Sequence, residues 1–145
     1  MRNHHLGFFV RFAELVDQKL KSADQVLWHR RMSAEQDNLR AALEWGLNTD
    51  PDRALRIAGA ANLFWTAGGY SAEGFRWTQK ALEEAEKTHV PSNLTNEQRL
   101  VARAKALCGL TRLYLSLGDN ANAKSAAADL TQLAELLERM IAAVD

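Results

Sequence analysis

Apolar residues recur every three or four positions along almost the whole chain, and this spacing constrains the fold more than any other feature. Residues that share such a spacing lie on one face of an α-helix. Alanine and leucine supply 45 of the 145 residues, whereas valine and isoleucine supply eight. Because β-branched residues favour strands while alanine and leucine favour helix, the sequence predicts an all-α fold.

Local start and stop signals divide the chain into six or seven helices. The first helix is expected over residues 3–20. Ser33 and Gln36 have the spacing of a capping box, so residues 24–47 are expected to form two helices with a break near Met32, or one bent helix. A helix that starts at Pro51 and runs to about residue 67 is apolar on most sides, which predicts a central position. The other boundaries fall at caps and glycines: Asp50, Gly68 with Gly69, Ser71, Thr95 with Gln98, and Gly118 with Asp119.

An internal repeat predicts that the helices pack in pairs. Two sets of residues share the offsets three, four, four, five and seven: Ala58, Ala61, Trp65, Gly69, Gly74 and Ala81, then Leu107, Leu110, Tyr114, Gly118, Ala123 and Leu130. This is the tetratricopeptide spacing, in which a glycine turns the chain and a small residue lets the second helix cross closely. The copies lie 49 residues apart, against about 34 in a simple array, and we assign the excess to a longer helix and a loop at 90–94. The sequence predicts a right-handed α-α superhelix of tetratricopeptide-like helix pairs.

We expect one domain with three parts. Residues 1–49 form an N-terminal helical cap, residues 50–90 a first degenerate repeat, and residues 95–145 a second repeat with an extended last helix. The sequence starts directly on a helical pattern at Met1. We therefore expect this chain to be a fragment of a larger protein.

Composition argues against several classes of partner. The formal net charge is zero, whereas nonspecific nucleic-acid binding needs a basic face. The densest basic cluster, His29-Arg30-Arg31, is interpreted as a solvated helix face. No apolar run reaches the length of a membrane span. Cys108 is the single cysteine, which excludes an internal disulfide, predicts a small core residue and fits a cytoplasmic location.

Motifs for catalysis are missing from the sequence. There is no phosphate-binding Gly-x-x-x-x-Gly-Lys-Ser/Thr loop, no His-Glu-x-x-His and no Gly-x-Ser-x-Gly. The pair His4-His5 has no third ligand nearby in sequence, so a structural or exposed role is favoured over metal binding. We expect no cofactor, no metal and no enzymatic activity.

Several residues have a structural and a functional interpretation. Asn38 lies within an expected helix, and we favour a buried amide that joins two helices over a ligand contact. The tryptophans could line a sugar or peptide site, but at helical spacing we favour packing anchors. They are Trp28, Trp45, Trp65 and Trp77.

One part of the sequence resembles a known family. The most specific block runs from Asn38 to Trp45, within the segment Glu35-Gln-Asp-Asn-Leu-Arg-Ala-Ala-Leu-Glu-Trp45. Four further features belong to the resemblance: Phe64-Trp65 with Gly69; Glu73-Gly-Phe-Arg-Trp77; Ala81-Leu82; and His5, Phe9, Ala13 and Trp28. Together they resemble the tetratricopeptide-like region of bacterial signal-transduction ATPases, found in LuxR-type and antibiotic-regulatory-type transcriptional regulators. The resemblance covers roughly residues 4–131.

The resemblance implies a sensor or scaffold segment that follows an ATPase core. Its partners would be other domains of the same regulator or another protein. An alternative is that the concave groove, formed by the first helices of the repeats, binds a small-molecule inducer.

The last helix departs from that family pattern, because it continues where a further turn is usual. Its apolar residues recur every seven positions, as in Ala123, Leu130 and Leu137. One interpretation is a helix that caps the repeat stack. The other is a helix whose end docks a partner, or a second copy in a homodimer, through Leu133, Leu137, Met140, Ile141 and Val144.

Overall fold

The computed structural model describes residues 2–87 and 95–144, with the side chains of residues 3 and 144 excepted. These residues form seven α-helices and no strand, which confirms the predicted all-α class. The expected loop at 90–94 lies outside the described residues. The helices are α1 (Arg2–Lys19), α2 (Gln25–Ala34), α3 (Gln36–Thr49), α4 (Pro51–Gly68), α5 (Ser71–Lys87), α6 (Asn96–Ser116) and α7 (Asn120–Val144).

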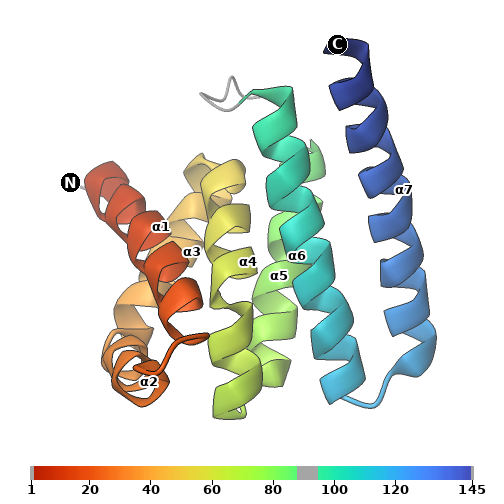
Figure 1. The fold of residues 1–145 in the computed structure, drawn as a ribbon. Helices are drawn as coiled ribbons and strands as arrows, with labels where there is room; N and C mark the ends of the chain where they lie inside the picture. Colours follow the sequence, from red (N-terminus) through yellow and green to blue (C-terminus); the bar gives the residue numbers. More distant parts are fainter. Residues whose placement is uncertain (1, 88–94, 145) are drawn as a thin grey trace.

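The helices form a stack of two layers, with the shorter α2 at one end (Figure 1). Helices α1, α4 and α6 lie side by side, and α3 and α5 lie behind them. Helix α7 packs on α6 at the opposite end of the stack from α1 and α2. None of the helices in the described part of the chain is long and apolar enough to cross a membrane.

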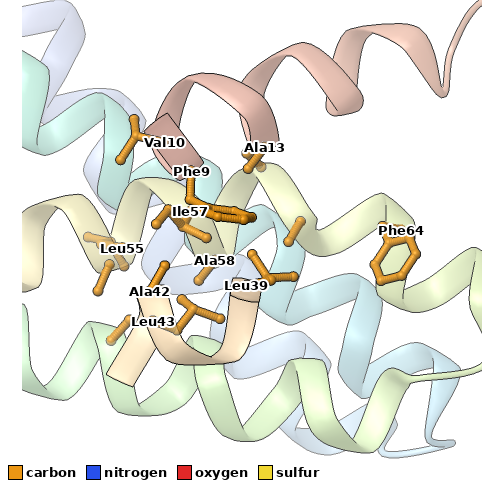
Figure 2. Close-up of a cluster of buried hydrophobic side chains, with 14 of the residues drawn as sticks. Phe9, Val10, Ala13, Leu39, Ala42, Leu43, Leu55, Ile57, Ala58 and Phe64 are labelled. Atoms are coloured by element: carbon orange, nitrogen blue, oxygen red, sulfur yellow. The ribbon is translucent and has the colours of Figure 1, made fainter. Parts of the chain in front are cut away.

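Helix α4 lies at the centre of the main core, as its all-round apolar sequence predicts. It contributes Ala58, Phe64 and Trp65, none of them more than 1 % exposed. Figure 2 shows side chains of α1 and α3, among them Phe9 and Leu39, meeting those of α4. A smaller second core lies between α5, α6 and α7 and is built around Leu107, Leu110, Ala126 and Leu133.

Most predicted helix ends are confirmed. The Asp50 side chain accepts a hydrogen bond from the Arg53 N–H at 3.4 Å, and Pro51 follows as the first residue of α4. Thr95 and Gln98 form the reciprocal hydrogen bonds of a capping box at the start of α6. The Gly69 and Gly118 turns have φ of 81° and 77°, a left-handed conformation that glycine adopts without steric cost.

One predicted boundary and one predicted cap are wrong. The break between α2 and α3 lies at Glu35 and not near Met32, and Ser33 lies inside α2. Met32 is fully buried, and its packing holds the last turn of α2 in the helix. The helix therefore continues past Ser33, the residue that was predicted to cap the next helix. Ser71 begins α5, but its hydroxyl hydrogen-bonds with the Ser116 hydroxyl at 2.8 Å.

Candidate interaction surfaces

A cleft of about 360 Å³ opens on the layer formed by α1, α4 and α6. Its apolar walls include Leu55, Ala102 and the exposed Val101. Gly59 of α4 also lines it, and a Cβ there would meet the backbone of Ala106 at 3.4 Å. The glycine therefore allows α4 and α6 to lie close together beneath the cleft.

Three of the four charged side chains that line this cleft form ion pairs, and Glu97 forms none with a described residue. Arg56 contacts Glu14 at 2.6 Å, which joins α4 to α1. Lys105 of α6 contacts Asp17 of α1 at 3.0 Å, and Lys21 approaches the same carboxylate at 3.6 Å. The Asp17 side chain is only 9 % exposed, so these two cations compensate a nearly buried charge. These ion pairs hold the layer together and occupy groups that could otherwise contact a ligand.

A second groove, of about 700 Å³, lies between α3 and α5 on the other layer. Arg40 of α3 binds Glu73 of α5 through two hydrogen bonds, Nε to Oε1 at 2.6 Å and Nη2 to Oε2 at 3.0 Å. The Trp77 indole N–H also donates to Glu73 at 3.3 Å. The hydrogen bond from Arg40 lowers the pKa of the Glu73 carboxyl, and Glu73 raises the pKa of Arg40. Both charges are therefore kept, and the pair joins the two helices.

The Arg40–Glu73 pair was not predicted from the sequence. Both residues belong to segments that carry the family resemblance, but 33 positions separate them and no local pattern links them. Trp77 has a structural role here, as predicted for the tryptophans. Trp65 is buried in the main core. The other three tryptophans are partly buried and pack against this core: Trp28, Trp45 and Trp77.

Among the other residues singled out from the sequence, Asn38 and Cys108 are less buried than expected, whereas His4 and His5 have the exposed and structural places that were favoured. Asn38 is exposed, and its amide donates to Glu35 at 2.9 Å, so the buried-amide interpretation is wrong. The physical reason is its position in the first turn of α3, where it does not face the core. Cys108 is half-buried. His4 is exposed, while His5 packs its ring against Phe9.

The predicted docking residues on α7 divide into covered and uncovered positions. Leu133 is 9 % exposed and belongs to the second core, and Leu137 and Met140 are half-buried. Ile141 is 60 % exposed, and the side chain of Val144 lies outside those described. Ile141 lies seven residues after Ala134, on the same side of α7, and Ala134 is exposed as well.

No group of three or more metal-ligating side chains occurs in the parts of the chain that the structure describes. No protein-family model, curated protein or solved structure matches the chain.

Proposed function

We propose that this chain is a non-catalytic, tetratricopeptide-like module that binds a protein partner inside a bacterial signalling or transcriptional regulator in the cytoplasm. The observation that carries the proposal is the pairing of α4 with α5 and of α6 with α7. Each pair turns at a left-handed glycine, Gly69 or Gly118, and these glycines occupy the same place in the two sequence copies. Stacked helix pairs of this kind provide extended surfaces for binding other proteins.

The crossing of α4 and α5 supports the repeat interpretation. A Cβ at Gly74 would lie 2.8 Å from the Trp65 ring, so only glycine permits this approach. In the second pair Ala123 occupies the corresponding position and is 3 % exposed. Tyr114, which corresponds to Trp65, packs edge-on against Phe75 with ring centroids 5.1 Å apart. Both pairs thus place a small residue at the crossing and an aromatic residue in a core.

The far end of α7 is the surface we assign to the partner. Ala127, Ala134 and Ile141 are spaced by seven residues, so they lie along one stripe of the helix. Ala127 is half-buried, but Ala134 and Ile141 are exposed. An apolar helical stripe that its own chain leaves uncovered suits a partner helix.

Photocross-linking in the source cell tests this proposal. A photoreactive amino acid replaces Ile141, and a second version carries it at the exposed Gln79 of α5 as a control. We expect a discrete protein adduct from position 141 that is missing from position 79. That adduct would contain either another part of the regulator, a separate protein or a second copy of this chain. Identical adducts from both positions, or none from position 141, would contradict the proposal.

The cleft between α1, α4 and α6 favours the alternative of a small-molecule sensor. Its volume of about 360 Å³ lies at the small end of the range for ligand sites. The ion pairs of Glu14 with Arg56 and of Asp17 with Lys105 leave few polar groups to orient a ligand. A saturable rise in melting temperature with a metabolite, abolished by Val101→Trp at the cleft, would establish the sensor function instead.

A further inference from the structure

Exposed large apolar side chains lie mainly at the two ends of the stack. Within the described residues, α3, α4 and α5 carry none. At one end Phe8 and Leu15 of α1 and Val26 and Leu27 of α2 are between 40 % and 63 % exposed. At the other end α6 carries Leu115, the turn that follows it carries Leu117, and α7 carries Leu136 and Ile141. The remaining one, Val101 of α6, lines the cleft between α1, α4 and α6. A repeat stack normally closes its ends with polar faces, so both ends of this one are suited to further packing.

The two ends carry opposite charge. Residues 2–34 contain six Lys and Arg against three Asp and Glu, whereas residues 129–144 contain three Asp and Glu against one Arg. The cations Arg11, Lys19, Arg30 and Arg31 of the first end make no ion pair with any described residue. The same holds for the acids of the second end, which are the exposed Asp129, Glu135 and Glu138.

We propose that copies of this chain associate head to tail, with the C-terminal half of α7 in one copy against the α1–α2 end of the next. This inference rests on the proposed function and names its partner as a second copy. Contact would bury Ile141 and Leu136 against the apolar residues of α1 and α2, and bring Glu135 and Glu138 towards the unpaired cations. The two surfaces lie at opposite ends of the stack (Figure 1), so the contact is heterologous. When two copies associate, one surface of each copy stays uncovered and can bind a further copy.

A second copy is favoured over an unrelated partner by the presence of both surfaces on one molecule. An acidic, apolar helix from another protein would suit the α1–α2 end equally well in chemistry. The end of α7 is itself an acidic, apolar helix. Every copy of the chain carries both this helix and the α1–α2 end, so the two surfaces are always present at equal concentration.

Sedimentation velocity of the complete chain tests the assembly. The wild type is expected to sediment as larger species with rising concentration, and less so at high salt, because exposed charge pairs are screened. The double variant Arg11→Glu/Arg30→Glu reverses charge at the first end, and Glu135→Lys/Glu138→Lys reverses it at the second. All four residues are exposed, so circular dichroism should confirm unchanged folding. Each variant alone is expected to associate at least about tenfold more weakly, because like charges then face each other.

An equimolar mixture of the two variants distinguishes head-to-tail association from other arrangements. Mixing restores complementary charge at every contact, so the mixture is expected to associate again. If the Arg11→Glu/Arg30→Glu variant associates as the wild type does, α7 pairs with α7, and the head-to-tail arrangement is wrong. A strictly monomeric wild type also overturns it. A monomer that still forms the adduct at position 141 with a different protein leaves the proposed function standing, whereas a monomer without that adduct removes both.

Discussion

At the residue scale, Gly74 determines how closely α5 approaches α4. The Trp65 ring fills the space that a side chain at this position would need, with a closest approach of 2.8 Å. Trp65 is 1 % exposed and has core residues around it, so the ring has no room to move away. The crossing therefore depends on the absence of a single methyl group.

We predict that Gly74→Ala lowers the free energy of unfolding by about 1–3 kcal/mol through overpacking. Urea denaturation of the variant and the wild type measures this loss. Gly7→Ala is the matched control, because a Cβ at Gly7 meets nothing closer than 3.6 Å. That change should raise stability by up to about 1 kcal/mol, since alanine loses less entropy than glycine in a helix. Equal effects of the two substitutions would show that the contact with Trp65 is unimportant.

Glu73 provides a prediction about pH. Its folded-state pKa lies below the ordinary value of 4.5, so the pair with Arg40 stabilises the fold fully above about pH 4.5. That contribution is lost as the pH falls through the folded-state pKa, because the unfolded chain binds the proton more readily. Glu73→Gln should therefore cost up to about 1 kcal/mol at pH 7, and this difference should shrink in acid. Urea unfolding between pH 7 and pH 3 measures the difference.

Glu83→Gln, on the same helix, is the control for this pH dependence. Glu83 is exposed and forms no ion pair with any described residue, so its substitution should change stability little at any pH. A difference between wild type and Glu73→Gln that stays constant down to pH 3 would contradict the role assigned to the ion pair.

At the scale of the helices, Asp24 and Asp50 each directly precede a helix, but only one of the two side chains caps its helix. The Asp50 side chain accepts a hydrogen bond at the start of α4, whereas the Asp24 side chain makes no capping bond at the start of α2. Helix α4 is central to the core, while only Met32 of α2 is buried. The cap of α4 therefore contributes to the stability of the whole domain.

We predict that Asp50→Ala lowers the free energy of unfolding by about 0.5–2 kcal/mol, the usual cost of losing a helix cap. Asp24→Ala removes an aspartate from an equivalent position that makes no cap, and should change stability by less than about 0.5 kcal/mol. Thermal denaturation followed by circular dichroism compares the two. If Asp24→Ala were the more damaging, the assignment of the caps would be incorrect.

At the scale of the whole molecule, the two cores differ greatly in size. The main core contains 21 buried apolar residues from α1 to α6, and the second core contains four from α6 and α7, among the described residues. Helix α7 is attached mainly through α6 at one end of the stack. Regions with few buried apolar contacts open more readily than the rest of a protein.

We predict that amide hydrogens of α7 exchange at least about tenfold faster than those of α4, through opening that leaves the main core folded. Hydrogen–deuterium exchange with peptide resolution measures both helices in one experiment. Identical protection of α4 and α7 would show that the molecule opens only as a unit. If copies associate head to tail, protection of the second half of α7 should rise with protein concentration.

Local sequence signals were enough to predict the helical class and most helix ends. The glycine turns at Gly69 and Gly118 and the caps at Asp50 and Thr95 depend on residues within about one turn of each other, so their signals are local. The central position of α4 followed from its composition, because a helix that is apolar on most sides has to be covered on most sides.

Which side chains meet and which stay uncovered depends on contacts between helices that are distant in sequence, and no local pattern predicts these contacts. Arg40 reaches Glu73, and Lys105 reaches Asp17, across helices that are distant in sequence. Leu133 and Ile141 both belong to the apolar pattern of α7, yet Leu133 is buried in the second core, whereas Ile141 lies on the same stripe as the exposed Ala134 and is uncovered. A periodic pattern fixes the face on which a residue lies. The position of the neighbouring helices determines which of these faces is covered.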